Sequence, residues 1–332
     1  MAPASVKQSR HGYTVISQIG EGAFARLYLV SSKTSLYVLK EHKTTSKTLA
    51  DAQHMLTEVQ ILRRSSRHPC IIGFHEAFIS PSGGVLSIVC EYASGGDLQA
   101  LLKRYRAFPG TKPGDDIVCS WIAQIGLGLH ALHRMFNVMH RDIKPANILV
   151  LGDGRVVLGD FGSSKVLETD LAVSFVGTPF FMSPEILRGE SYDFSSDVWA
   201  LAVLGFEAVT LEKPFLIGDG GVGRRAPITL GELRRRIELG QGAWHLLRGS
   251  RLEPLLLAMS AQKKELRPPI NEVLLFPAVS AGLGGFIRDL AAGKFSISAP
   301  KADMLVNQIS AIGLRGLALQ SLRLGRAQRR KR

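Results

Sequence analysis

Cysteine is scarce in this chain of 332 residues. Its three cysteines, Cys70, Cys90 and Cys119, form no C-x-x-C pair. A disulfide-stapled scaffold needs several cysteine pairs, and a structural zinc site needs cysteines or histidines at close spacing, so the sequence indicates neither class. We therefore expect a protein of a reducing compartment.

Long apolar runs are lacking as well. The N-terminal stretch MAPASVKQSRHGYT has no apolar core of signal-peptide length, and no run approaches the ~18 apolar residues that a bilayer-spanning helix needs. Hydrophobic residues still make up 45% of the chain, enough to form a buried core. We expect an intracellular protein without a membrane span, located in the cytoplasm, with the nucleus and the cytoskeleton as alternatives.

Acidic residues are outnumbered, most of all near the C-terminus. The chain has 41 lysines and arginines against 28 aspartates and glutamates, a net charge of +13. Residues 301–332 hold eight of the basic residues and one acidic residue, Asp303, and so supply more than half of that charge. A basic run such as LRLGRAQRRKR is commonly solvated or disordered. Nuclear targeting, or binding of an acidic partner or nucleic acid, is the alternative.

Alternation of apolar and polar residues predicts strands in the first hundred residues. Residues 13–41 follow this pattern with breaks at 20–22 and 31–35, which predicts three successive antiparallel strands. Helical spacing predicts a helix over 47–64, and two further strands are predicted over 72–79 and 85–92, on either side of the turn SPSGG. The expected unit has five strands and one helix.

Helical spacing dominates after residue 95. The predicted helices cover 97–105, 115–136, 195–211, 229–239, 251–260 and 268–276. This order predicts an α+β fold of two lobes, a small β-rich N-lobe with one main helix over 13–92 and a larger α-helical C-lobe over 93–277, with a cleft near 91–96. Residues 1–12 form an N-terminal extension and 278–332 a basic C-terminal tail. Within the tail, 303–322 favour a helix that packs on the large lobe or on a partner.

The stretch IGEGAFARLYLV, residues 19–30, lacks the third glycine of a nucleotide-binding loop, because Ala25 stands there. A strand pattern follows the loop, whereas a dinucleotide fold needs a helix. This favours a hairpin that folds over phosphates, with an ordinary hairpin turn as the alternative. Lys40 at the end of the third strand and Glu58 in the predicted helix favour the phosphate-binding reading, since a phosphate-binding lysine needs a carboxylate partner.

The stretch MHRDIKPANILVLGDGRVVLGDFGSSK, residues 139–165, contains H-R-D-x-K-x-x-N followed by D-F-G. With these motifs the chain resembles eukaryotic protein kinases over residues 13–277. The resemblance implies a bilobal protein-kinase-like fold, Mg²⁺ and ATP as cofactors, and protein substrates. It also implies that Asp142 accepts the proton of the substrate hydroxyl, that Lys144 neutralises charge on the γ-phosphate, and that Asn147 and Asp160 hold magnesium.

The same resemblance implies a nucleotide site. Lys40 would contact the α- and β-phosphates, steadied by Glu58. Cys90 would be the gatekeeper, and backbone groups of residues 91–93 would face the adenine edge. The implied ATP-binding residues are Ile19, Gly20, Glu21, Gly22, Ala23, Phe24, Ala25, Arg26, Leu27, Val38, Lys40, Glu91, Ala93 and Leu149. Leu27, Val38 and Leu149 would sandwich adenine, and Ala25 would tune nucleotide affinity.

Other implied contacts support the site. Phe161, His140 and Leu62 would stack into a column. Glu185 would pair with Arg267, and Asp197 would brace the backbone of the catalytic loop. In both contacts a charged side chain would be buried, and a buried charge stabilises a protein only when it is paired.

Lys144 two residues after Asp142 resembles serine/threonine kinases, and the phrases EYASGGDL, FVGTPFFMSPE and FEAVTLEKPF resemble the NIMA-related kinases. A pseudokinase or scaffold that binds nucleotide or a partner without catalysis is the alternative. Arg141 before Asp142 implies activation by phosphate on the activation loop, with Ser174 as the first candidate and Thr169 as the second. Thr178 is expected to be a structural contact, and the insertion at 216–229 matches no pattern.

Overall fold

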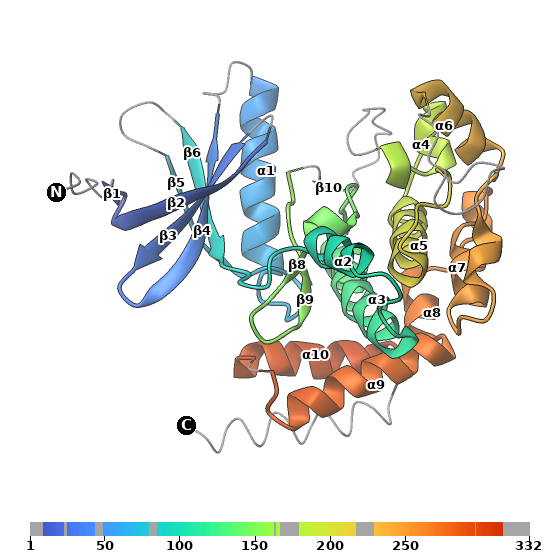
Figure 1. The fold of residues 1–332 in the computed structure, drawn as a ribbon. Helices are drawn as coiled ribbons and strands as arrows, with labels where there is room; N and C mark the ends of the chain where they lie inside the picture. The colour runs from blue at the N-terminus through green and yellow to red at the C-terminus, as the bar shows by residue number, and fades with distance from the viewer. Residues whose placement is uncertain are drawn as a thin grey trace.

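The computed structural model describes residues 9–22, 25–43, 49–79, 85–162, 164–166, 179–216, 229–295 and 297–314. They form two lobes, a small one built on a sheet and a larger helical one (Figure 1). The two-lobed α+β architecture predicted from the sequence is confirmed. Ala23, Phe24, Thr169, Ser174, Thr178, most of the insertion and the basic run at the C-terminus lie outside the described residues.

The small lobe is a six-stranded antiparallel sheet with one helix. The strand order is β1 (Ser9–Arg10), β2 (Tyr13–Glu21), β3 (Ala25–Ser32), β4 (Ser35–His42), β6 (Leu86–Glu91) and β5 (Phe74–Ile79), and the helix is α1 (Leu49–Ser65). The five predicted strands and the predicted helix are all present. The additional strand, β1, pairs two residues with β2 at the sheet edge, and a two-residue strand is too short to show alternation.

The large lobe is helical, with short strands at the cleft. Its helices are α2 (Leu98–Ala107), α3 (Asp115–His130), α4 (Pro184–Arg188), α5 (Ser195–Thr210), α6 (Leu230–Glu238), α7 (Glu253–Met259) and α8 (Ile270–Leu275). Its described residues also form four short 3₁₀ turns, η2 (Pro145–Asn147), η3 (Pro179–Phe181), η4 (Trp244–Leu247) and η5 (Lys264–Leu266). They also form two pairs of short strands: β8 (Ile148–Val150) pairs with β9 (Val156–Leu158), and β7 (Val138–Met139) pairs with β10 (Lys165–Val166). The predicted helix 115–136 is α3 continued by the wider turn η1 (Ala131–Phe136).

Two helices follow α8 and pack along the bottom of the molecule in Figure 1: α9 (Pro277–Ala291) and α10 (Ala299–Ala311). The sequence patterns do not predict α9. The helix expected over 303–322 corresponds to α10, which begins earlier, at Ala299, and ends at Ala311. At Gly282 the backbones of α9 and α3 approach so closely that a Cβ atom would lie 2.6 Å from the carbonyl carbon of Cys119.

The stretch Lys264–Ala291 is long and apolar enough to cross a membrane by length and composition, contrary to the expectation that no run approaches that length. In the structure this stretch is divided among η5, α8 and α9, and α9 begins with Pro277 directly after α8. Val279, Leu283 and Phe286 are buried in the hydrophobic core of the large lobe. The apolar stretch is therefore explained as part of that core.

Most buried apolar residues form one cluster that extends from the large lobe into α1, β5 and β6, where it includes Ile61, Leu62 and Ile88. A second, smaller cluster lies within the sheet of the small lobe, around Val30, Leu39 and Val89. Because the main cluster crosses from one lobe to the other behind the cleft, α1 and the strand before the hinge are packed against the large lobe.

Candidate active site

A cleft of about 560 Å³ lies between the lobes. Of the predicted ATP-binding residues, those that line it are Ile19, Gly22, Ala25, Leu27, Val38, Lys40, Glu91, Ala93 and Leu149, and Glu58, Asn147 and Asp160 line it as well. The cleft has apolar walls from both lobes and a few polar groups at one end, the usual form of a small-molecule site. The structure thus brings most of the predicted nucleotide-site residues to one cavity.

Three predicted residues of the glycine loop do not line the cleft: Gly20, Glu21 and Arg26. Glu21 and Arg26 are paired across the β2–β3 hairpin, and the Glu21 carboxylate also contacts Lys43 at 2.5 Å. The tight turn itself is closed by a hydrogen bond from the Gly22 N–H to the Ala25 carbonyl, 2.9 Å long. The side chains of Glu21 and Arg26 therefore lie at the rim of the loop.

Several lining residues were missed by sequence reasoning: Ile72, Ile88, Ser94, Gly96, Asp97 and Ala146. Ile72 and Ile88 are apolar residues of the small lobe that look like any other core position in a sequence. The hinge residues could have been found by extending the predicted segment 91–93 toward α2. There the Val150 N–H donates to the Gly96 carbonyl at 2.8 Å, which ties the hinge to β8.

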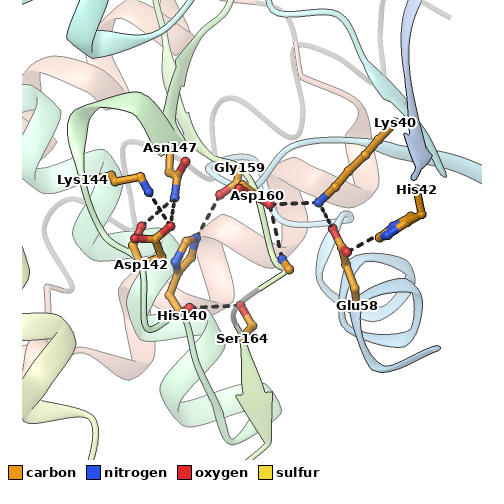
Figure 2. A network of polar contacts seen from close by, with 11 residues as sticks. Lys40, His42, Glu58, His140, Asp142, Lys144, Asn147, Gly159, Asp160 and Ser164 are labelled. Atoms are coloured by element: carbon orange, nitrogen blue, oxygen red, sulfur yellow. Dashed lines mark hydrogen bonds and ion pairs between the residues drawn. The ribbon is translucent and has the colours of Figure 1, made fainter. Parts of the chain in front are cut away.

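One polar group in the cleft is centred on Lys40 (Figure 2). Its Nζ lies 2.6 Å from Glu58 Oε1 on α1 and 3.0 Å from Asp160 Oδ1. Burial alone would lower the pKa of Lys40, but the carboxylates of Glu58 and Asp160 outweigh it and raise that pKa above its ordinary value. Lys40 therefore stays charged at the place where the two lobes meet.

A second polar group is centred on Asp142, which lies in a hollow beside the cleft with Phe181 and Met182. Lys144 Nζ donates to Asp142 Oδ2 at 2.7 Å. Asn147 Nδ2 donates to the same oxygen and to the Asp142 backbone carbonyl, both at 2.8 Å. These bonds fix the Asp142 carboxylate in one orientation, as Figure 2 shows.

The backbone is strained beside both groups, and beside Asp142 it is held by a buried carboxylate. Arg141 and Asp160 have φ values of 69° and 53°, a region that residues other than glycine seldom adopt. Asp197 Oδ1 accepts from the Arg141 N–H at 2.8 Å, and its Oδ2 accepts from the His140 N–H at 2.9 Å. Burial raises the pKa of Asp197, but the His133 ring and these bonds outweigh it and lower that pKa. The predicted bracing contact is present.

The predicted Glu185–Arg267 pair is also present, and so is the His140–Phe161 part of the predicted column. Arg267 donates to Glu185 Oε1 at 2.7 Å and Oε2 at 2.8 Å, and both side chains are buried. The rings of His140 and Phe161 lie 5.1 Å apart, and Leu62 belongs to the same core. Since Phe161 follows Asp160 directly, this packing holds Asp160 in the cleft, with its Oδ1 on Lys40.

Comparison with known proteins agrees with this geometry. A family profile described as "Protein kinase domain" matches residues 13–244. The serine/threonine-protein kinase Nek3 of Mus musculus is 36% identical over 209 residues, which cover 61% of this chain and 39% of that protein. The serine/threonine-protein kinase Nek2 of Homo sapiens is 33% identical over 281 residues, which cover 81% of this chain and 60% of that protein.

Similarity is not confined to the Nek kinases. Mitogen-activated protein kinase kinase 3 of Arabidopsis thaliana is 35% identical over 214 residues, covering 64% of this chain and 40% of that protein. The chain spans less than two thirds of the length of each of these three relatives.

Proposed function

The chain belongs to the protein kinase family, and we propose that it is an ATP-dependent serine/threonine kinase of the NIMA-related group that phosphorylates protein substrates. The Nek relatives support the group, and Lys144 two residues after Asp142 supports the serine/threonine type. Phosphoryl transfer asks a protein mainly for positioning and charge neutralisation, and the cleft offers fixed charged groups for both.

Asp142 is the proposed proton acceptor. Lys144 and Asn147 both donate to its Oδ2. No described residue donates a hydrogen bond to Oδ1, so this oxygen is left for the hydroxyl of a serine or threonine substrate. Lys144 sits close enough to neutralise charge on the transferred phosphoryl group while it orients the carboxylate.

The donor set at the inner end of the cleft suits magnesium. Asn147 donates through Nδ2 to Asp142, which leaves its amide oxygen for a cation, and Asp160 supplies a carboxylate. The described residues contain no group of three or more His, Cys, Asp or Glu side chains that could hold a metal alone. This fits Mg²⁺, which takes few protein ligands and keeps water and phosphate oxygens. When bound, the ion supplies neutralisation of phosphate charge, and Lys40 would contact the α- and β-phosphates.

The observation that carries the proposal is the fixed Asp142–Lys144–Asn147 group beside a cleft that holds Lys40, Glu58 and Asp160. The test is transfer of labelled γ-phosphate from Mg·ATP to a generic basic protein, followed by identification of the phosphorylated amino acid. Asp142→Asn should lower turnover by about 10²- to 10⁴-fold, because the proton acceptor is lost. Label should appear on serine and threonine.

The matched control is Asp116→Asn, which removes a carboxylate whose side chain is 91% exposed, far from the chemistry. Its turnover should equal that of the wild type. Equal labelling by wild type and Asp142→Asn would contradict the catalytic proposal and would leave a nucleotide-binding pseudokinase or scaffold.

Regulation by phosphate on the activation loop is part of the proposal, with Ser174 as the first site and Thr169 as the second. Its support is Arg141, which lies directly before Asp142 and next to the buried Asp197. A phosphate added to the loop could pair with such an arginine and order the loop. Ser174→Ala should therefore lower turnover, after pre-incubation with Mg·ATP, by about tenfold. Unchanged turnover in Ser174→Ala would contradict Ser174 as the phosphorylation site. If Thr169→Ala lowered turnover in its place, the site would be Thr169.

A further inference from the structure

A buried histidine, His42, lies next to the Glu58 carboxylate of the Lys40–Glu58 pair. It lies on β4 two residues after Lys40, and side chains two residues apart on a strand point to the same face. Its side chain is 8% exposed, and its Nε2 lies 3.7 Å from Glu58 Oε2 (Figure 2). Lys40 holds the other oxygen of the same carboxylate, Oε1, at 2.6 Å.

The His42 ring nitrogen has no other described partner. Its Nε2 is buried and makes no hydrogen bond within the described part of the chain, because 3.7 Å is too long for one. A buried polar group without a partner is unfavourable, so such a group is kept only where it acquires a partner or another role. The nearest candidate partner is the second oxygen of Glu58.

The partners of Glu58 would change when nucleotide binds. In the structure Lys40 divides its hydrogen bonds between Glu58 and Asp160. Under the proposed function Lys40 would turn toward phosphates and Asp160 toward magnesium. The hydrogen bond from Lys40 to the Glu58 carboxylate would then weaken. A donor on the far side of that carboxylate would then keep it in place.

We infer that His42 is a positioning residue for Glu58: its neutral ring donates from Nε2 to Glu58 Oε2 and thereby keeps Oε1 directed at Lys40 while Lys40 binds the nucleotide phosphates. This inference rests on the proposed function and deepens it. The contact is specific to the imidazole, since an apolar side chain at position 42 would fill the space without a donor.

The charge state of His42 agrees with this role. Burial lowers its pKa below the ordinary value, and so does the Lys40 ammonium, while the carboxylates of Glu58 and Asp160 act in the opposite direction. These are the charged groups that face the ring from β4, from α1 and from the segment after β9. The ring is therefore neutral at pH 7. Below that pKa it becomes a cation that competes with Lys40 for Glu58 and repels the Lys40 ammonium.

The test compares His42→Leu, which removes the donor, with His42→Gln, whose amide N–H reaches about as far as Nε2. We expect His42→Leu to lower kcat/KM for ATP by about tenfold and His42→Gln by less than about threefold, at equal melting temperatures. The ratio of wild-type to His42→Gln kcat/KM should also fall as the pH drops below 6.5, since the glutamine cannot become charged. Equal kcat/KM in the wild type and both variants, or equal losses in both variants, would overturn the inference.

Binding of Mg·ATP, measured by calorimetry on the same three proteins, separates this inference from the proposed function. If the wild type binds Mg·ATP but transfers no phosphate, the proposed activity fails, and weaker binding by His42→Leu than by His42→Gln still supports the inference. If the wild type neither binds nor transfers, both are overturned. If the wild type is active and the three proteins bind and turn over alike, the inference alone is overturned.

Discussion

At the scale of single residues, two arginine–glutamate pairs are each joined by two hydrogen bonds but differ in burial and in their other contacts. Arg267 forks onto both oxygens of Glu185, lies over the Trp199 ring at 5.0 Å and is fully buried. Arg188 forks onto Glu190 at 2.6 and 2.9 Å on the surface. In the interior, each charge of a pair depends on its partner for the solvation it has lost.

Glu185→Gln should destabilise the protein by about 3–5 kcal/mol, because it leaves the Arg267 charge buried without its counter-charge. Glu190→Gln, the matched change on the surface, should leave the urea midpoint unchanged within error. Urea unfolding of both variants at pH 7 checks this, and similar midpoints for the two would contradict the argument.

In the wild type, acid should remove the stability that the Glu185–Arg267 pair contributes. Burial raises the pKa of Glu185, but Arg267 outweighs it and lowers that pKa below 4.5. A carboxylate whose pKa is lower in the folded state stabilises the fold fully above its unfolded pKa, here 4.5. The stability from Glu185 is lost as the pH falls below 4.5 through the folded-state pKa.

The contacts of residues that belong to a motif could be predicted from the sequence. Asp142, Lys144 and Asn147 stand within one short motif, and Glu185 and Arg267 meet although they are 82 positions apart. The sequence could not predict the Ser196 hydroxyl that donates to Glu185 at 2.7 Å, or the direction of the His42 ring, because these depend on packing between elements. For Glu21 and Arg26 the motif was not enough, since their side chains pair with each other and do not line the cleft.

At the scale of elements, the contact of α9 with α3 depends on one glycine. A Cβ atom at Gly282 would lie 2.6–2.8 Å from backbone atoms of Cys119 and Ser120, which cannot move aside as a side chain can. At Gly285, one turn later on α9, a Cβ atom would meet only the end of Arg288 at 3.8 Å. The two positions therefore offer a matched pair of substitutions.

Gly282→Ala should destabilise the protein by about 1–3 kcal/mol, because α9 must move away from α3. Gly285→Ala should instead leave stability unchanged or raise it by up to about 1 kcal/mol, because alanine is the better helix former. Thermal melting of the two variants checks this prediction. A loss of stability in Gly282→Ala no larger than in Gly285→Ala would show that α9 is not held at this contact.

The same glycines explain why α9 escaped prediction. Helices with one apolar face, such as α6, are visible as a periodic pattern, whereas α9 mixes small and apolar residues and has glycines at 282, 284 and 285. Glycine inside a segment argues against a helix from propensity alone, and tertiary packing on α3 overrides that preference. Strands and helices with clear periodicity were predicted to within a few residues.

At the scale of the whole molecule, α10 connects the two lobes through a buried polar network. Gln308 Nε2 donates to the Leu127 carbonyl at 2.8 Å and lies 3.0 Å from His130 Nδ1. Its Oε1 lies 2.7 Å from Nε2 of His68, in the segment between α1 and β5. His68 Nδ1 accepts from the Cys70 N–H at 3.1 Å, so its Nε2 carries the proton. Each histidine therefore accepts a hydrogen bond at Nδ1 and must be neutral.

This network should make the whole molecule less stable in mild acid. Burial lowers the pKa of His68 and that of His130 to about 4 each. A histidine whose pKa is lower when folded binds more protons when unfolded, so stability falls as the pH drops from 6.5 toward 4. Between pH 7 and pH 5 each of the two should cost up to about 2 kcal/mol of unfolding free energy.

Urea unfolding at pH 5, 6 and 7 measures this slope directly. In His130→Asn the amide oxygen takes the place of Nδ1 and can still accept from Gln308 but cannot be protonated, so the pH dependence should decrease by about one proton. His245→Asn, a change at an exposed histidine, should leave the slope as it is in the wild type. If His130→Asn and His245→Asn show the same slope, His130 does not couple α10, and with it the junction of the lobes, to pH.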